Sequence, residues 1–212
     1  NIVGISCKSQ NFASASTVAR ITKAVDKRTL VILGGPHPTA QPLEVMRCPD
    51  VDFTVRGEGE LTIVELLKAI QNRQGFEHIQ GINYRRNGLV YENPPRDLIE
   101  DLDSLPFPNE TAEKTLKDYQ HYSISALKYI FATRGCPYNC IYCGSRYIWG
   151  RHVRFRSPEN VVAEIQGLQK KGLRLVHFSD DTFGVNKDYL RRICHALASQ
   201  CKNLRWSCET HV

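Results

Sequence analysis

The chain has 212 residues, a hydrophobic content of 42% and a formal net charge of +6. This length allows one large domain or two small ones, and the hydrophobic content is ordinary for a globular protein. The modest charge does not require a nucleic-acid partner, and no apolar run is long enough to span a bilayer.

The first part of the chain alternates strands with helices. We expect buried strands at residues 2–6, 29–33 and 51–55, lying side by side in a parallel sheet. Apolar residues at helical spacing predict two helices, one with Val18, Ile21 and Val25 on one face and one with Ile63, Leu66, Leu67 and Ile70. A hairpin is expected at residues 79–85 and 89–92, turning at Asn87-Gly88.

Prolines without periodicity then mark a connector at residues 92–127. We therefore expect one domain at residues 1–91 and a second at residues 128–212. The second contains strands at residues 128–133, 173–178 and 204–207. Ser157-Pro158 and Asn186 are predicted to begin its two helices, whose apolar faces carry Val161, Ile165, Leu168, Leu190, Ile193, Cys194 and Leu197.

Eight cysteines occur in the chain, and three of them form a compact motif. The other five are scattered along predicted core elements, unlike the disulfide framework of a small secreted protein. This distribution favours free thiols in a reducing cytoplasm.

The motif contains Cys136, Cys140 and Cys143, spaced Cys-x3-Cys-x2-Cys directly after an apolar strand. Structural zinc sites and electron-carrier clusters usually have four protein ligands. Three thiolates would hold three irons of a 4Fe–4S cluster and leave the fourth iron open to a small molecule. A zinc site that recruits His121 or His152 is the weaker alternative.

This pattern resembles the radical S-adenosylmethionine (SAM) enzymes. The resemblance implies a barrel whose first strand leads into the cysteine loop, and a cluster that splits SAM into methionine and a 5′-deoxyadenosyl radical. It also implies that Tyr142 packs near the SAM adenine and that Asp180 and Asp181 hold the SAM amino group. A structural ring at Tyr142 and turn capping by one aspartate are the alternatives.

The first half resembles the cobalamin-binding domain that precedes many radical SAM domains. The resemblance rests on Val3-Gly4-Ile5-Ser6 and residues 33–39, 55–60 and 101–108. It implies that Ser6 lies near the nucleotide tail of cobalamin and that Gly34 and Gly35 make room for it. For His37, a loop contact is favoured over a role as a cobalt ligand.

The chain departs from the full family pattern. It lacks two strand–helix units at the start of the cobalamin-binding fold, and it supplies three of about six units of the barrel. We therefore expect an internal fragment: a truncated Rossmann-like parallel sheet followed by a partial (β/α) barrel. Glu209 and His211 follow the last strand, and relatives often have Arg at a position like that of His211.

Arginines and aromatic residues surround the cysteine motif. The arginines are candidates for binding SAM or an anionic substrate, and a solvated basic face is the alternative; they are Arg134, Arg146, Arg151, Arg154 and Arg156. Stacking of a single-stranded nucleic acid on Tyr138, Tyr142, Tyr147 and Trp149 is less favoured, because a cluster loop needs apolar shielding anyway.

The sequence thus predicts a cobalamin-dependent radical SAM enzyme that performs methyl transfer or an oxygen-independent cyclisation. A non-catalytic iron–sulfur or zinc module is the alternative. We expect a 4Fe–4S cluster, SAM and cobalamin as cofactors. The expected partners are a small-molecule substrate and an electron donor such as a flavodoxin or ferredoxin, without nucleic acid.

Overall fold

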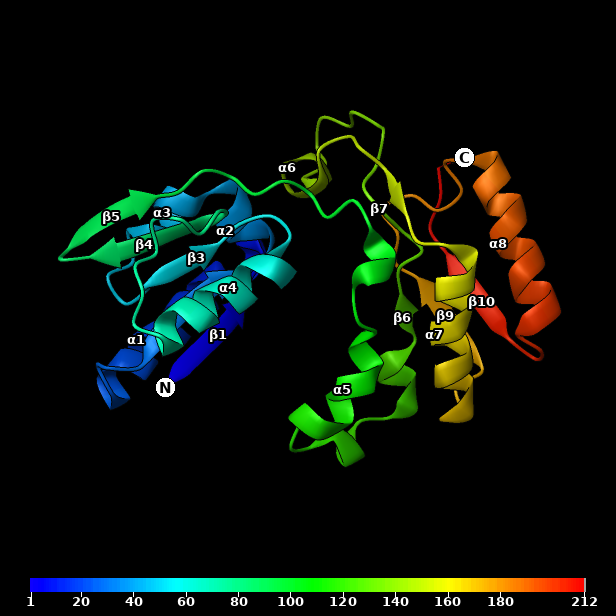
Figure 1. The fold of residues 1–212 in the computed structure, drawn as a ribbon, viewed down its shortest axis with the longest axis horizontal. Coiled ribbons are helices and arrows are strands. Elements are labelled where there is room, and N and C mark those ends of the chain that lie inside the picture. Colours follow the sequence, from blue (N-terminus) through cyan, green and yellow to red (C-terminus); the bar gives the residue numbers. More distant parts are fainter. Residues whose placement is uncertain (212) are drawn as a thin grey trace. The chain divides into compact units, whose positions relative to one another are not determined.

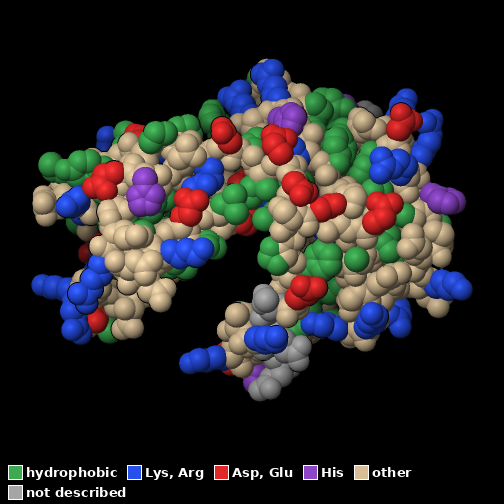
Figure 2. Space-filling model, in the orientation of Figure 1, with side chains coloured by type: hydrophobic (Ala, Val, Ile, Leu, Met, Phe, Trp, Pro, Cys, Tyr) green, Lys and Arg blue, Asp and Glu red, His purple; other side chains and the backbone are tan. Residues whose placement is uncertain are grey.

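The computed structural model describes residues 1–211, and its internal contacts divide it after Ile99 into two units (Figure 1). Unit 1 comprises Asn1–Ile99, and unit 2 begins at Glu100. Within residues 1–211, no helix is long and apolar enough to span a membrane. Acidic and basic side chains both occur on the visible face of each unit, as the modest net charge indicates (Figure 2).

Unit 1 is built on a five-stranded sheet in the order β1-β2-β3-β4-β5. The strands β1 (Ile2–Ser6), β2 (Leu30–Gly34) and β3 (Phe53–Val55) are parallel neighbours, which confirms the predicted arrangement. The predicted hairpin forms from β4 (Ile82–Arg86) and β5 (Leu89–Glu92). It also extends the sheet, because β4 pairs antiparallel with β3.

Alternating residues of β2 face opposite sides of the unit 1 sheet. Val31 and Leu33 pack with α1 (Phe12–Val25) and α3 (Pro42–Met46), whereas Ile32 packs with α4 (Gly59–Gln71). Two short helices, η1 (Ser9–Asn11) and α2 (Pro36–Ala40), follow the carboxyl ends of β1 and β2. This alternation is the period of two that a strand buried on both faces requires.

The apolar stripe predicted for the first helix does not face the sheet. Val18, Ile21 and Val25 are 45%, 55% and 83% exposed, and α1 instead packs through Ala15 and Ala19. The small side chains of Ala15 and Ala19 contact the sheet. The larger side chains of Val18, Ile21 and Val25 face away from it. In α4 the prediction is closer: Leu66 is buried with Ile63 and Ile70 packed beside it, while Leu67 is 40% exposed.

Unit 2 contains a parallel three-stranded sheet in the order β10-β9-β6, which confirms the predicted second βα series. Its strands are β6 (Tyr129–Ile130), β9 (Leu175–Phe178) and β10 (Arg205–Cys208). The helices α7 (Pro158–Lys170) and α8 (Lys187–Gln200) share one core with Ile130, Val176 and Phe178. These two helices therefore cover one face of the sheet.

The predicted helix starts in unit 2 are confirmed. The Ser157 hydroxyl accepts the N–H of Asn160 at 3.1 Å, and the Asn186 side chain accepts the N–H groups of Asp188 and Tyr189. Each of these bonds satisfies a backbone donor that the first helical turn leaves without a partner.

The predicted first strand of unit 2 is interrupted. Residues 128–133 were expected to be continuous, but β6 ends at Ile130 and β7 (Thr133–Arg134) pairs separately with β8 (Arg154–Phe155). The break occurs because the N–H groups of Ala132 and Thr133 donate to the side chain of Asp180 instead of to a neighbouring strand.

Part of the segment expected as a connector packs on unit 2. The carboxylate of Asp103 accepts the N–H of Ser157 at 2.9 Å, and the Phe107 ring lies 5.5 Å from the Arg156 guanidinium. The segment also forms η2 (Leu102–Ser104), α5 (Pro108–Thr115), η3 (Tyr119–His121) and η4 (Ile124–Leu127). The proline-rich stretch at residues 102–108 thus contributes to the start of α7.

Candidate functional site

The cysteine loop, residues 135–144, runs from the end of β7 to the start of α6 (Ser145–Trp149). It begins beyond β6, at the carboxyl end of the parallel sheet, where ligands bind in open α/β folds. The three motif cysteines, Cys136, Cys140 and Cys143, are free thiols. The loop therefore lies after the first strand of the second sheet, as the sequence indicated.

Gly135 sets the course of the first part of the loop. Its φ of 101° lies in the left-handed region, and a Cβ atom at this position would overlap the carbonyl oxygen of His152. Only glycine lets the backbone pass this close. Cys136, the next residue, therefore starts from a position that backbone contacts define.

The other two cysteines lie in the outer part of the loop. The N–H of Cys143 donates to the carbonyl of Cys140 at 3.1 Å, and the intervening Ile141 and Tyr142 are 91% and 88% exposed. A hydrogen bond with the Cys140 side chain raises the pKa of the Tyr142 hydroxyl. Among the side chains that the structure describes, no three of His, Cys, Asp or Glu are gathered as metal ligands.

Three consecutive residues after β9 contact the loop and the strand that leads into it. Asp180, which is 3% exposed, accepts hydrogen bonds from the N–H groups of Ala132 and Thr133 and from the Thr133 hydroxyl. The Asp181 carboxylate accepts the Ser145 hydroxyl at 2.7 Å. Thr182 approaches Cys136, with 3.3 Å between Oγ1 and Sγ.

The buried position of Asp180 has an electrostatic consequence. Burial raises the pKa of this carboxyl, and the hydrogen bonds from Thr133 and Ala132 partly offset the rise. The Tyr189 hydroxyl, whose pKa burial also raises, donates to the Ala132 carbonyl at 3.3 Å. The Ala132 N–H thus donates to the Asp180 side chain, and its carbonyl accepts both the Tyr189 hydroxyl and, at 2.9 Å, the N–H of Arg156.

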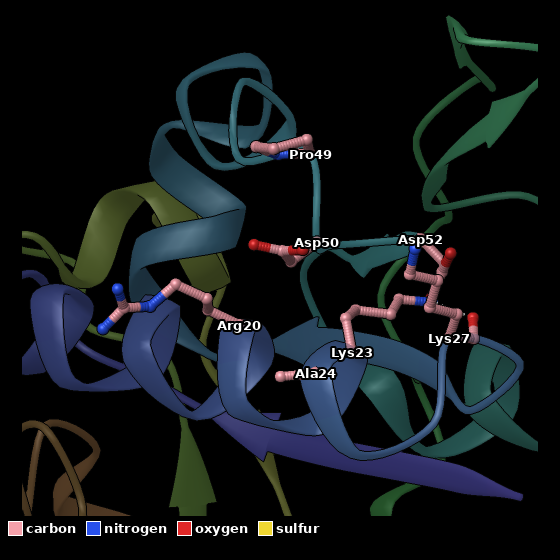
Figure 3. A pocket seen from close by; sticks show the side chains of 7 residues that line it. All are labelled: Arg20, Lys23, Ala24, Lys27, Pro49, Asp50 and Asp52. Atoms are coloured by element: carbon pink, nitrogen blue, oxygen red, sulfur yellow. Dashed lines mark hydrogen bonds and ion pairs between the residues drawn. The ribbon is translucent and has the colours of Figure 1, made fainter.

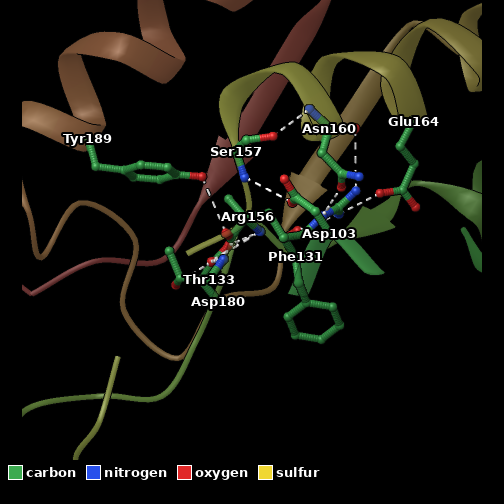
Figure 4. A network of polar contacts seen from close by, with 10 residues as sticks. Asp103, Phe131, Thr133, Arg156, Ser157, Asn160, Glu164, Asp180 and Tyr189 are labelled. Atoms are coloured by element: carbon green, nitrogen blue, oxygen red, sulfur yellow. Dashed lines mark hydrogen bonds and ion pairs between the residues drawn. The ribbon is translucent and has the colours of Figure 1, made fainter. Parts of the chain in front are cut away.

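One of the arginines proposed for SAM or substrate has a structural role. The guanidinium of Arg156 forms a 2.6 Å ion pair with Glu164 on α7, and both side chains are largely buried, with 11% and 5% exposure (Figure 4). It also donates to the Phe131 carbonyl and to the Asn160 side chain. Arg156 is therefore not part of a solvated basic face, because its charge is neutralised inside unit 2.

The other arginines have different surroundings. Arg154 is 3% exposed, so it lies inside unit 2 as well. Arg134 and Arg146 lie over the rings of Trp149 and Tyr147, at 5.5 and 5.0 Å from the ring centroids. These aromatic contacts hold two cations beside the cysteine loop.

The end of β10 also reaches the cysteine loop. The ring of His211 stacks on Tyr138, which lies between the first two cysteines, with a centroid separation of 4.7 Å. The backbone carbonyl of Glu209 accepts the N–H of Phe183 at 2.9 Å. His211 therefore supports the loop from the third strand.

In unit 1, the predicted cobalamin contacts meet at the ends of β1 and β2. Ser6 and Gly34 are register partners, and Gly35 follows with a φ of 97°. A Cβ atom on Gly35 would lie 2.9 Å from the Ser6 hydroxyl oxygen and 3.0 Å from the Cys7 carbonyl oxygen. On Gly34 it would make only ordinary contacts with Val55, the nearest at 3.7 Å. Gly35 is therefore needed by the fold itself, whereas the fold would accept a Cβ atom at Gly34.

His37 lies in α2, directly after the glycine pair. Its ring is 6% exposed, packs against Phe12 at 4.4 Å, and has Nδ1 3.0 Å from the Ser9 hydroxyl oxygen. Its Nε2 has no hydrogen-bond partner among the described residues. His37 is thus buried between α2, η1 and the start of α1.

A shallow cavity in unit 1 lies away from these residues. It is lined by α1 and by the segment before β3, where Lys23 forms a 2.6 Å ion pair with Asp52 (Figure 3). The Asp52 carboxylate also accepts the N–H of Val31, near the start of β2. The cavity therefore lies at the amino-terminal ends of the strands, opposite the predicted cofactor contacts.

Two family models match the chain. A B12 binding domain matches residues 1–67, and the Radical SAM superfamily matches residues 130–211, which include the cysteine loop. The chain belongs to the cobalamin-binding radical SAM family. One match thus covers the parallel strands of unit 1, and the other covers the parallel sheet of unit 2.

Two curated proteins are similar along most or all of the chain. An uncharacterized methyltransferase of Pyrococcus horikoshii is 35% identical over 216 residues, covering 100% of this chain and 46% of that protein. An anaerobic magnesium-protoporphyrin IX monomethyl ester cyclase of Synechocystis sp. is 33% identical over 188 residues, covering 86% of this chain and 37% of that protein. The chain thus spans less than half the length of these relatives.

A solved structure shows the same fold. It is the cobalamin-dependent S-adenosylmethionine radical enzyme OxsB with aqua-cobalamin and S-adenosylmethionine bound. Its TM-score is 0.74 at 19% identity, over 97% of this chain and 30% of that chain. At this identity the likeness concerns the fold alone.

Two residues of the site, Gly135 and Thr182, were not predicted from the sequence. Gly135 directly precedes the motif, and a glycine between a strand and the first cysteine was an available signal. Apart from its position after Asp180-Asp181, no sequence pattern indicated a role for Thr182. Its contact with Cys136 joins residues that are 46 positions apart.

Proposed function

We propose that the protein is a cobalamin-dependent radical SAM enzyme that acts on a small molecule. The observation that carries the proposal is the loop of three free thiols at the carboxyl end of a parallel sheet, within the Radical SAM match. The glycine pair at the carboxyl end of β2, within the B12 binding match, supports the second cofactor. When bound, the cluster supplies an electron for reductive cleavage of SAM, and cobalamin supplies a second reactive centre.

The residues of the chain would serve these cofactors in distinct ways. Cys136, Cys140 and Cys143 would bind the cluster as thiolates, releasing their protons to solvent. The exposed carboxylate of Asp181 suits the SAM ammonium group, and Asp180 remains a predicted contact whose carboxylate also orders β7. The exposed ring of Tyr142 would cover the SAM adenine. Ser6, Gly34 and Gly35 would line the passage for the cobalamin tail.

The proteins similar to this chain include a methyltransferase and a cyclase. Both reactions therefore occur among the names of its relatives. We propose methyl transfer or oxygen-independent cyclisation of an organic substrate. A flavodoxin or ferredoxin is the proposed electron donor. The eight free cysteines support a location in the reducing cytoplasm.

Iron loading tests the cluster proposal. After anaerobic reconstitution, the protein is expected to hold about four irons per chain, as a 4Fe–4S cluster requires. Addition of SAM is expected to change the EPR signal of the reduced cluster, because the fourth iron has no protein ligand. Iron and sulfide analysis with EPR spectroscopy makes the measurement.

A matched pair of variants controls this experiment. Cys143→Ser removes a motif thiol and should abolish stable loading, whereas Cys194→Ser, outside the motif on α8, should load like the parent protein. Tight binding of one zinc per chain without a cluster would contradict the proposal and favour the zinc alternative.

Gly34→Val tests the cobalamin proposal. The methyl groups of the added side chain are expected to extend beyond the contact with Val55 into the passage proposed for the cobalamin tail, and to weaken cobalamin binding by at least about tenfold, which corresponds to about 1.4 kcal/mol. Binding of hydroxocobalamin is measured by the absorbance retained after gel filtration. Gly4→Ala is the control, since a Cβ atom there meets nothing within 4 Å. Equal cobalamin binding by the Gly34→Val variant and the parent protein would contradict the assignment.

A further inference from the structure

Thr182 is the residue after β9 whose side chain reaches a cysteine of the motif. Its Oγ1 lies 3.3 Å from the Sγ of Cys136, and the residue is 7% exposed. A hydroxyl this close to sulfur, and largely shielded from water, is a hydrogen-bond partner for the cysteine.

The position of Thr182 is fixed from both sides. On one side, Asp180 is bound to the backbone of Ala132 and Thr133. On the other side, Phe183 is buried and its N–H donates to the Glu209 carbonyl at 2.9 Å. The Thr182 hydroxyl is therefore placed by rigid neighbours and does not depend on the exposed outer loop.

Cys136 is fixed in a similar way. Gly135 passes close to His152, and β7 pairs with β8 immediately before it. By contrast, the outer loop between Cys140 and Cys143 is exposed. The structure thus holds the first cysteine in place through backbone contacts, while Cys143 and the two residues before it are exposed.

We propose that Thr182 is a positioning residue for Cys136, which holds the thiol ready for metal and donates a hydrogen bond to its sulfur once a metal is bound. This inference rests on the proposed cluster at Cys136, Cys140 and Cys143. It assigns to Thr182, which lies outside the cysteine motif, an influence on the reduction potential of the cluster.

The Thr182 hydroxyl has a single proton. The acceptor of this proton depends on whether Cys136 is a free thiol or a metal-bound thiolate. In the present structure Thr182 Oγ1 donates to the Asp181 carbonyl at 2.6 Å, so the thiol of Cys136 can donate to Oγ1. When Cys136 binds metal, its proton leaves for solvent and its sulfur becomes only an acceptor. Rotation about the Cβ–Oγ1 bond then turns the hydroxyl towards the sulfur, and the Asp181 carbonyl bonds to water instead.

A hydrogen bond to a ligating sulfur has a measurable consequence. It stabilises negative charge on the cluster, and the reduced cluster carries one more negative charge than the oxidised one. Thr182 should therefore raise the reduction potential of the bound cluster. A merely structural threonine would have no such effect.

The test compares Thr182→Val with Thr182→Ser in the whole protein after anaerobic reconstitution. Thr182→Val keeps the shape but removes the hydroxyl, and Thr182→Ser restores it. Thr210→Val is the matched control, because Thr210 donates at 2.6 Å to the Phe183 carbonyl in the same segment without contacting a motif cysteine. Iron content and the midpoint potential, from an EPR-monitored redox titration, are measured for each variant.

We expect Thr182→Val to have a lower midpoint potential than the parent protein, and Thr182→Ser and Thr210→Val to have the parent value. Loss of iron in Thr182→Val that Thr182→Ser restores would also support positioning. An unchanged potential at full iron content in Thr182→Val, or equal losses in both Thr182 variants, would overturn the inference. If the parent protein binds no cluster, the proposed function fails first, which distinguishes the two failures.

Discussion

Gly135→Ala is expected to destabilise unit 2 by about 3 kcal/mol or more. Two causes act together: the left-handed φ of 101° is unfavourable for alanine, and the new methyl group would overlap the backbone carbonyl of His152. Because this oxygen belongs to the backbone, it cannot move aside as a flexible side chain would. The loop and β8 would have to separate, which also displaces Cys136.

Tryptophan fluorescence during urea unfolding measures this effect in unit 2. Both tryptophans of the chain, Trp149 and Trp206, lie there, and Trp206 packs against Phe178 in the core. Gly144→Ala is the control at the other end of the loop, where φ is −84° and a Cβ atom meets nothing within 4 Å. A Gly135→Ala variant as stable as the Gly144→Ala variant would show that the close backbone approach is not needed.

Asp180→Ala is expected to lower the free energy of unfolding by about 3 kcal/mol. The substitution leaves three donors without their acceptor in a buried place: the N–H groups of Ala132 and Thr133 and the Thr133 hydroxyl. Asp181→Ala is the neighbouring control and should change stability by about 0.5 kcal/mol or less, since Asp181 is exposed. Equal stability of the two variants would contradict the role assigned to Asp180.

The pH dependence of unfolding gives a second measurement on Asp180. Burial raises the pKa of this carboxyl, so the folded protein holds the proton more tightly than the unfolded chain does. The contribution of Asp180 to stability is therefore greatest below the ordinary carboxyl pKa of about 3.9 and falls as pH rises through the raised value. Asp180→Asn has no such proton, and its urea midpoint should fall less than that of the parent protein from about pH 4 upward.

The helices and parallel strands could be predicted because their signals are local. Val161, Ile165 and Leu168 recur at helical spacing and are buried together on α7. Ser157 and Asn186 cap their helices through bonds that span two or three residues. The order of the parallel strands could be predicted as well, because parallel strands that follow one another along the chain lie side by side in both sheets.

The failures share a different physical origin. The break after Ile130 depends on Asp180, and the neutralisation of Arg156 depends on Glu164 on α7. The outward turn of Val18 depends on how closely Ala15 and Ala19 approach the sheet. The periodicity of the sequence cannot predict these three features. Each depends on a contact with a residue or an element that is distant in the sequence. Likewise, the cysteine spacing identified the loop but not its support by Thr182.

The bonds from Asp180 to Ala132 and Thr133 also constrain the order of events during synthesis. Asp180 follows Ala132 by 48 residues, and a ribosome adds these in roughly 2 to 10 s at about 5–20 residues per second. During that interval the thiols of the cysteine loop have been made, but the carboxylate that orders the preceding strand has not. The order of the strand that leads into the cysteine loop therefore depends on a residue that is made after the whole loop.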